Sequence, residues 1–365
     1  MSYYDIVPVR GNPRNSEGAF FLTDEKELLF IYSGFHGDSF FDHAYADIML
    51  IRSRDGGKSW SEPETVARAA DYHAMNVMSV SLLPMNNGDI GLFYLVRMDW
   101  LDMPIILQRS HDGGKTWSEP VRCSTRKSYY VINNDRAVRT SSGRIILPAA
   151  DHENRIAEDG GVRFAPAKAV FFLSDDDGLT WKEADAKITL DYPVCHSGLQ
   201  EPGVIETAPG RLYGWARTDL GRQYEFTSED DGLHWTQAFP SRFTSPLSPL
   251  SMKRLRDGRF AALWNPVPHC NITVVNRATG NRTPLVCAFS DDQGKTWGDP
   301  QVIEDDPDSG YCYTAIFPME DQLLLAYCAG SEQDMGGCLN RLRIRRLPLP
   351  SKEKASFQES SAKNA

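Results

Sequence analysis

The sequence has 365 residues, of which 41% are hydrophobic and 24% are charged, and its formal net charge is −10. This composition suffices for a large buried core, and the acidic balance without a basic run argues against wholesale binding of nucleic acid or of an anionic membrane. A small anionic ligand needs only a local cationic pocket, which the net charge leaves open. No stretch approaches the roughly 18 apolar residues of a membrane-spanning helix.

The first ten residues, MSYYDIVPVR, lack the basic and then apolar pattern of a secretory signal. We therefore expect a cytoplasmic protein, although a chain from which a signal had been removed would look the same. The cysteines are odd in number and scattered without C-x-x-C spacing: Cys123, Cys195, Cys270, Cys287, Cys312, Cys328 and Cys338. We expect reduced thiols, and the eight histidines show no metal-binding spacing, so no metal or other cofactor is expected.

Apolar segments and an eight-residue repeat alternate along the chain. Each apolar segment has the outline of a hairpin, with a strand, a polar turn and a second strand. The hairpins are expected at 19–35, 77–97, 137–151, 203–217, 250–265 and 314–330. The repeats between them are SRDGGKSW from Ser53, SHDGGKTW from Ser110, SDDDGLTW from Ser174, SEDDGLHW from Ser228 and SDDQGKTW from Ser290. Regular self-similarity of this kind indicates a repeat architecture.

Each repeat is interpreted as a tight turn. Its third residue, an Asp, can accept backbone N–H groups, and its glycine two residues later can adopt the positive φ that a tight reversal needs. The Trp at its end is expected to begin the returning strand and to bury its ring against a neighbouring sheet. His234 stands where the other repeats have Ser or Thr, and we expect it to leave the turn intact. The repeats are therefore scaffold.

The pattern S-x-D-x-G-x-[ST]-W resembles the Asp-boxes of the sialidase superfamily. That resemblance implies an all-β fold, a six-bladed β-propeller of four-stranded antiparallel blades, here as a single domain over residues 1–349. The sixth hairpin is followed by one further strand in 339–349, so the N-terminal segment YYDIVPVR is expected to supply the missing strand and close the ring. Residues 350–365 are polar and are expected to form a disordered tail.

Chain direction in such a blade sorts residues between the two faces of the ring. The segment before each inner strand and the loop between second and third strands share one face, and the repeats lie on the other. The first set is Arg14, Glu17, Asn76, Asp135, Arg136, Glu201, Ser248, Tyr311 and Tyr313. The second set is His36, Asp38, Asp42, Arg97, Asp99, Asp151, His152, Arg217, Arg222, Asn265 and Arg282. A concave mouth with such residues suits a small polar, anionic ligand.

The resemblance also assigns roles to four of these residues. QEPGVIE with LYGWARTD resembles the segment that carries the family's activating glutamate and one arginine of its carboxylate clamp, which indicates Glu201 and Arg217. NRTPLVCAFSDDQGKTW resembles the strand with another clamp arginine, here Arg282. GYCYTAI resembles the segment of the tyrosine nucleophile, and Tyr313 aligns better with it than Tyr311.

Two further assignments depart from the family pattern. The family's Arg-Ile-Pro motif is absent, and PRNSEGAF offers Arg14 as the remaining clamp arginine. HGDSFFDH offers Asp38 and Asp42 as the catalytic acid, with a slight preference for Asp42. The other candidates for substrate contact are Asp38, Asn76, Arg97, Asp135, Arg136 and His152.

The resemblance implies a retaining glycoside hydrolase that removes a terminal sialic acid from a glycan. Arginine suits bidentate recognition of the carboxylate. A neutral tyrosine avoids the repulsion that a carboxylate nucleophile would meet, the glutamate takes its proton, and a sheltered, protonated Asp serves as the acid. Two alternatives remain: a propeller glycosidase for an arabinose, rhamnose or uronic-acid glycoside, or a non-catalytic carbohydrate-binding propeller whose rim would carry Trp100, Trp215 and Trp264.

Overall fold

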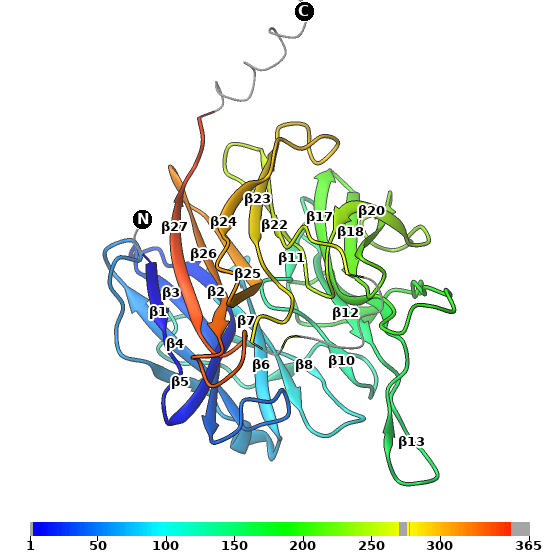
Figure 1. Cartoon of the computed structure of the whole chain (residues 1–365), viewed down its shortest axis with the longest axis horizontal. Coiled ribbons are helices and arrows are strands. Elements are labelled where there is room, and N and C mark those ends of the chain that lie inside the picture. The colour runs from blue at the N-terminus through cyan, green and yellow to red at the C-terminus, as the bar shows by residue number, and fades with distance from the viewer. Residues whose placement is uncertain (1–2, 270–275, 277, 352–365) are drawn as a thin grey trace, which may run out of the picture.

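The computed structural model describes residues 3–269, 276 and 278–351, and it is built almost entirely of β-strands. Helix in the described residues is limited to the 3-10 turn Ala69–Tyr72 (η1), and no helix there is long and apolar enough to cross a membrane. Six antiparallel sheets follow one another around a ring (Figure 1). The expected six-bladed β-propeller is confirmed.

The first three blades follow the chain, and each runs from an inner strand at the axis to an outer strand at the rim. Blade one is β2 (Gly11–Leu22), β3 (Leu28–Gly37), β4 (Ala46–Ser53) and β5 (Glu64–Ala67). Blade two is β6 (Asn76–Pro84), β7 (Ile90–Arg97), β8 (Ile105–Ser110) and β9 (Val121–Arg122). In blade three the inner strand is split into β10 (Tyr130–Val131) and β11 (Val138–Arg139), which are followed by β12 (Ile145–Asp151), β15 (Lys168–Ser174) and β16 (Lys182–Glu183).

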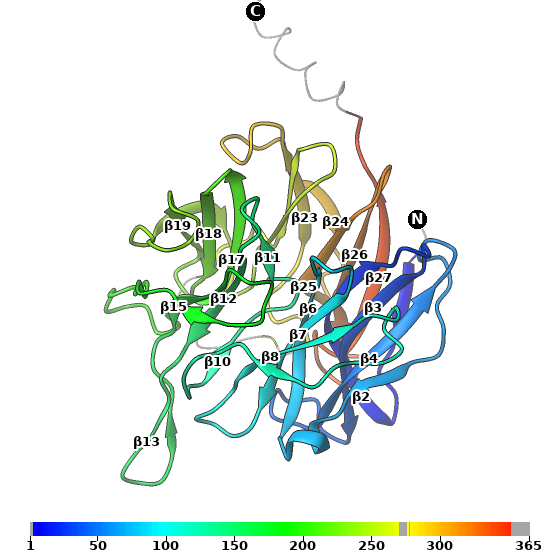
Figure 2. The ribbon, with the colours of Figure 1, turned by 180° about the vertical axis from the view of Figure 1, so that it is seen from behind.

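The other three blades repeat this order. Blade four is β17 (Gln200–Ala208), β18 (Arg211–Arg217), β19 (Arg222–Ser228) and β20 (Phe239–Thr244). Blade five is β21 (Ser251–Arg254), β22 (Phe260–Trp264), β23 (Leu285–Ser290) and β24 (Gln301–Glu304). Blade six is β25 (Ser309–Pro318), β26 (Gln322–Ser331), β27 (Leu342–Pro348) and β1 (Tyr3–Ile6). A separate hairpin of β13 (Arg155–Ile156) and β14 (Val162–Arg163) projects from the body in both views (Figures 1 and 2).

The two ends of the chain close the ring, as expected. β1 pairs antiparallel with β27, with Tyr3 opposite Arg345, and the two strands lie side by side in Figure 1. Asp5 on β1 accepts hydrogen bonds from Arg343 at 2.9 Å and from Arg341 at 3.1 Å. Residues 352–365, most of the expected C-terminal tail, lie outside the described residues.

Hydrophobic clusters fill the spaces between neighbouring blades. For example, Phe30 and Tyr32 of blade one pack with Leu324 and Ile344 of blade six. Because a central strand is covered on both of its faces, its sequence is a continuous apolar run rather than an alternating one, as in the fully buried stretch of β3 from Leu28 to Phe35. The blades thus leave only the two ends of the ring for polar chemistry.

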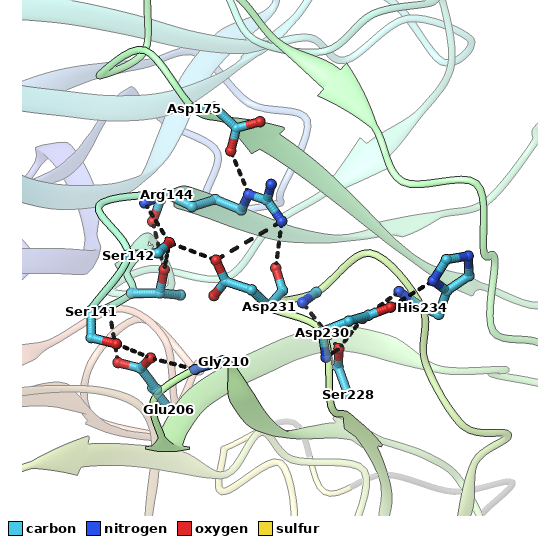
Figure 3. Close-up of polar contacts among 12 residues, drawn as sticks. Ser141, Ser142, Arg144, Asp175, Glu206, Gly210, Ser228, Asp230, Asp231 and His234 are labelled. Carbon is cyan, nitrogen blue, oxygen red and sulfur yellow. Dashed lines mark hydrogen bonds and ion pairs between the residues drawn. The ribbon is translucent and has the colours of Figure 1, made fainter.

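All five repeats form turns between the third and fourth strands of their blades. In the fourth repeat, Oδ1 of Asp230 accepts hydrogen bonds from Ser228 Oγ and from the His234 backbone N–H, both at 2.9 Å (Figure 3). Nδ1 of His234 lies 2.6 Å from Oδ2 of Asp230. In the second repeat Thr116 makes the equivalent contact, through its Oγ1 to Oδ2 of Asp112. The expected role of the Asp and the tolerance of His at this position are confirmed.

The glycine and the tryptophan of each repeat meet within the turn. Gly232 has a φ of 84°, as a tight reversal requires. Trp235 is half-buried, and its indole N–H donates to the carbonyl of Gly232 at 3.1 Å. The Trp therefore precedes the outer strand instead of beginning it, because its ring folds back over the turn.

Arginines join these turns to the preceding blade. Arg52 of blade one donates to the carbonyls of Gly113 and Gly114 in the second repeat, each at 2.9 Å. Arg144 of blade three donates in the same way to the carbonyl of Asp231 at 2.9 Å and to the carboxylate of Asp175 at 2.5 Å (Figure 3). The repeat turns therefore stabilise both their own blade and its junction with the neighbour.

The hydroxyl of Ser110 provides a test of this scaffold role. It donates to Asp112 and accepts the buried backbone N–H of Gly114 at 2.8 Å. Ser110→Ala leaves that N–H without its partner, and we expect it to lower the free energy of unfolding by about 1–3 kcal/mol. Urea unfolding measures this loss, and Lys115→Ala, at an exposed side chain of the same turn, is the control. An unchanged midpoint for Ser110→Ala would contradict the assignment.

Candidate active site

Two adjoining cavities open at the end of the ring opposite the repeat turns. The smaller cavity, of about 380 Å³, is lined by Glu17, Glu201, Arg217 and Tyr313 among others. The larger cavity, of about 720 Å³, includes Arg14 and Arg282 in its wall. Phe41, Asp42 and Gln200 belong to the linings of both. The face predicted from chain direction is therefore the one that carries the cavities.

Four residues of the smaller cavity share an unusual backbone conformation. Glu17, Ser79, Glu201 and Tyr313 have φ angles of 55°, 63°, 47° and 57°, and each lies at a register shift in the inner strand of its own blade. A bulge with a left-handed residue redirects a side chain that would otherwise point between blades. Such strain in residues other than glycine is typical of functional sites. The inner strands thus present polar groups to the axis.

Tyr313 and Glu201, assigned as nucleophile and base by resemblance, contact each other. The Tyr313 hydroxyl donates to Oε1 of Glu201 at 3.1 Å and accepts from Nη1 of Arg217 at 3.3 Å. Nη1 of Arg217 also lies 3.2 Å from Oε2 of Glu201. Burial and the Glu201 carboxylate raise the pKa of Tyr313 above its ordinary value, so the phenol is protonated in the free protein. Its proton faces the group assigned to accept it.

Arg14 lies between two carboxylates. Its guanidinium donates to Asp42 at 2.5 Å and to Glu17 at 3.1 Å, and it stacks over Phe35. The side chain of Asp42 is 63% exposed, while that of Glu17 is 6% exposed. Asn76 is buried and donates to the carbonyl of Asp42 at 2.6 Å, so it holds the Asp42 loop rather than facing a cavity.

The electrostatics of Asp42 differ from the expectation of a sheltered, protonated acid. Desolvation in the cavity wall raises the pKa of this carboxyl, but the nearby Arg14 guanidinium, supported by Arg97 and Arg217, more than offsets it. The net pKa is below the ordinary value, so Asp42 is ionised in the free protein. The ion pair with Arg14 accounts for this difference in the free protein, and the role of Asp42 as the acid stays a prediction.

Arg97 and His152 also line the smaller cavity. The Arg97 guanidinium lies over the rings of Trp100 and Tyr129, at 5.7 and 5.4 Å from their centroids. Its buried Nε has no hydrogen-bond partner among the described residues. Burial lowers the pKa of His152, whose Nδ1 faces the carbonyl of Ala165 at 3.2 Å. This part of the lining therefore combines aromatic surface with one cation.

Arg282 lies against the far side of Tyr313. It is 5.4 Å from the centroid of the Tyr313 ring, and it donates to Cys312 Sγ at 3.0 Å and to the carbonyl of Leu247 at 3.2 Å. Burial raises the pKa of Cys312, but the neighbouring thiols Cys328 and Cys338 and the Arg282 charge reverse the shift, so the net pKa is well below the ordinary value. The described cysteines are free thiols.

Several predicted site residues have other roles. Asp38 is exposed and lies outside the described linings of both cavities. Asp135 binds Lys253 Nζ at 2.6 Å and the Ile316 backbone N–H at 3.0 Å, and so ties blade three to blades five and six. Arg136 is 3% exposed and donates to the Leu250 carbonyl at 2.7 Å. The split inner strand of blade three thus directs Asp135 and Arg136 into the interfaces between blades. Substrate contact by these two residues and by Asp38 stays a prediction.

The structure also places the aromatic residues that the sequence analysis named. Tyr311 is 2% exposed and packs in the core between blades five and six, whereas Tyr313 reaches the cavity. Trp215 and Trp264 are 1% and 7% exposed, so they are core residues and not sugar-stacking groups on the rim. Trp100 is half-buried and lines the smaller cavity.

Glu17 was placed on the correct face by the sequence but received no role. One signal was present: a glutamate followed by glycine within an apolar inner strand, similar to the glutamate, proline and glycine at Glu201. A Cβ on Gly18 would lie 2.4 Å from the Phe30 ring, and one on Gly203 would lie 2.3 Å from the Trp215 ring. In both strands a glycine beside the bulge admits a ring from the neighbouring strand. The aromatic lining from Phe41, Tyr129 and Phe164 was missed, because all three rings lie outside the named strands.

Comparison with known proteins agrees with this architecture. The model of the BNR repeat-like domain matches residues 28–325. The chain belongs to the sialidase and BNR-repeat propeller superfamily. A sialidase of Bacteroides fragilis (strain YCH46) is 23% identical to this BNR propeller over 254 residues, which are 62% of the chain. The match spans 44% of that relative's length.

Solved structures share the fold of this BNR propeller at low identity. A Dyadobacter fermentans protein of unknown function has a TM-score of 0.71 and 18% identity, over 95% of this chain and 98% of its own. The Hadza microbial sialidase Hz136 has a TM-score of 0.70 and 17% identity, over 93% of this chain and 66% of its own. A leech intramolecular trans-sialidase has a TM-score of 0.69 and 14% identity, over 95% of this chain and 70% of its own.

The reassignment of Asp135 can be tested in this BNR propeller. Asp135→Ala removes an ion pair and leaves the Ile316 N–H without its acceptor, so we expect unfolding to become easier by about 1–3 kcal/mol. Lys253→Ala removes only the ion pair and should lower the free energy of unfolding by less. Denaturant unfolding of both variants checks the order. A stable Asp135→Ala protein that loses ligand affinity would favour the original prediction of substrate contact.

Proposed function

We propose that this BNR propeller is an exo-glycosidase of the sialidase type, which removes a terminal carboxylate-bearing sugar, sialic acid, with retention of configuration. The supporting observation is the Tyr313 hydroxyl, held between Glu201 at 3.1 Å and Arg217 at 3.3 Å in the smaller cavity. A phenol is a poor nucleophile near neutral pH unless a base takes its proton in the transition state. Glu201 is within reach to do so.

The reaction follows in two steps. Oη of Tyr313 bonds to the anomeric carbon while its proton passes to Glu201 and the aglycone oxygen leaves with a proton from Asp42. Water then gives a proton to Asp42 and bonds to the anomeric carbon, while Glu201 returns the proton to Tyr313. Two inversions produce net retention. Arg217, Arg282 and Arg14 surround this centre from three blades and bind the sugar carboxylate.

Asp42 must acquire its proton during substrate binding. In the free protein Arg14 keeps it ionised, and its side chain is exposed enough to move. When the sugar carboxylate takes the place of Asp42 on Arg14, the pKa of Asp42 returns toward the ordinary value of about 4 and rises further beside the anionic ligand. Activity is therefore expected to be highest at acidic pH, where this protonation costs least.

The nucleophile can be tested with a matched pair of tyrosine variants. Tyr313→Phe should abolish turnover of a fluorogenic α-sialoside, while Tyr311→Phe, the same change two residues away in the core, should retain kcat. Glu201→Gln should lower kcat by about 10²- to 10⁴-fold, as expected for loss of a general base. NMR of the first product formed should show the α-anomer. Turnover by Tyr313→Phe at the wild-type rate would overturn the mechanism.

The assignment of the acid can be tested through the leaving group. Asp42→Asn should slow an alkyl sialoside, whose alcohol needs a proton to depart, by about 10²- to 10⁴-fold. It should affect an aryl sialoside with an acidic phenol much less. Asp38→Asn, four residues earlier and exposed, is the control. Equal losses for both substrates in Asp42→Asn would show that Asp42 is not the proton donor.

If the sugar is not sialic acid, a panel of aryl glycosides will reveal it. Turnover of a uronide, arabinoside or rhamnoside without turnover of the sialoside would support the alternative glycosidase. Binding without turnover of any glycoside would support a carbohydrate-binding role.

A further inference from the structure

Glu17 is a buried carboxyl group to which the mechanism assigns no role. It projects from the bulge in β2 into the smaller cavity, and 6% of its side chain is exposed. Oε2 accepts hydrogen bonds from Arg14 at 3.1 Å and from Ser16 at 3.3 Å, and Oε1 accepts one from Ser79 at 3.2 Å. These contacts hold Glu17 beside Arg14, which is the one charged partner among them.

Charged and titratable groups surround Glu17 from several elements. Arg14 comes from β2, Asp42 from the loop after β3, Glu201 from β17, Tyr313 from β25 and Cys328 from β26. Asp42 and Glu201 oppose a negative charge on Glu17, and Arg14 favours it. In the free protein the Asp42 carboxylate is largely solvated, so water screens much of its repulsion.

Ligand binding changes this balance. A sugar carboxylate that takes the place of Asp42 on Arg14 would be enclosed by the cavity, where water no longer screens it. Two carboxylates beside one guanidinium in a poorly hydrated site repel strongly, and the usual outcome is that one of them takes up a proton. The carboxyl group of sialic acid is more acidic than that of Glu17 and stays ionised, which leaves Glu17 to take up the proton.

We propose that Glu17 is a proton-linked gate of the anion site: the sugar carboxylate binds at Arg14 together with a proton on Glu17. Glu17 is thus a positioning residue, because its neutral form leaves Arg14 free to bind the ligand. The inference rests on the proposed function in one respect, namely that the ligand carboxylate lies at Arg14.

The titration of Glu17 in the free protein agrees with this role. Burial raises its pKa to about 7, while Arg14 and Ser79 oppose the shift. The carboxyl is therefore neutral below about pH 7 and ionised above it. If only the neutral form binds, affinity falls about tenfold for each pH unit above 7, and it should be about 30-fold weaker at pH 8.5 than at pH 6.

Isothermal titration calorimetry of the full chain tests the gate. The probe is 2-deoxy-2,3-didehydro-N-acetylneuraminic acid, and each titration is repeated at pH 8 in buffers of different ionisation enthalpy. Wild type is expected to take up close to one proton per ligand. Asp42, displaced from Arg14, contributes little uptake at this pH, and Asp42→Asn should therefore keep most of it.

Glu17→Gln supplies a permanently neutral side chain of the same shape. It should bind the probe without proton uptake and with nearly equal affinity at pH 6 and pH 8.5. Glu320→Gln, at an exposed residue of the turn after β25, should behave as wild type. If Glu17→Gln does not fold, Ser79→Ala serves instead: loss of the hydrogen bond to Oε1 raises the pKa of Glu17 and moves the decline in affinity to higher pH.

The outcomes separate the gate from the proposed function. Binding by wild type without proton uptake, or uptake that persists in Glu17→Gln, overturns the gate and leaves the sialidase proposal intact. Failure to bind the sialic acid analogue, with proton-linked binding of a methyl glucuronide, supports the gate and overturns sialic acid as the substrate. Binding of neither compound overturns both.

Discussion

The burial of both faces of every blade is the constraint on which the rest of this structure depends. Apolar clusters fill each space between blades, so a polar side chain on a central strand has no solvent to face. The site escapes this constraint through bulges in the inner strands. At Glu17, Glu201 and Tyr313 a left-handed residue turns the side chain away from the interface and toward the axis. Local backbone strain is therefore what makes polar chemistry possible in this fold.

The same constraint explains why the charges of the site act as a group. Arg14 contacts both Asp42 and Glu17, and Arg217, Glu201 and Tyr313 contact one another; of these side chains only that of Asp42 is largely exposed. A ligand carboxylate that engages one guanidinium changes the proton affinity of every neighbouring acid. In the proposed mechanism, proton donation by Asp42 and ligand binding at Arg14 are linked for this reason, since the two residues are ion-paired in the free protein.

The sequence was most informative where the chain repeats itself. Six apolar hairpins with five repeats between them indicated the order of the blades, and the family resemblance implied their number. Alternating strand direction predicted which face of the ring carries the cavities. Tyr313, Glu201, Arg217 and Arg282 could be chosen because their segments resemble those of a known family. Arg14 was chosen although its family motif is absent, and it does line a cavity.

The structure differs from the sequence analysis where position on a face was taken as the direction of a side chain. Asp135 has the same left-handed conformation as Tyr313, yet it points to Lys253, because the inner strand of blade three is interrupted between β10 and β11. Trp215 lies two residues before the end of β18, yet its side chain is buried in the core. The ion pair of Asp42 with Arg14 joins residues 28 positions apart, and no spacing rule indicates it. Register and pairing of this kind depend on the folded backbone.

The arginines of the site show how such an arrangement affects stability. Arg97 is buried over two aromatic rings with an unpartnered Nε, whereas Arg52 and Arg144 at the other end of the ring are bonded to both carboxylates and backbone carbonyls. A buried cation without full partners is costly, and left-handed backbone adds to that cost. The repeat turns and the β1–β27 closure must offset it. Part of this stabilisation, that from the repeat turns, therefore lies at the end of the ring opposite the strained site.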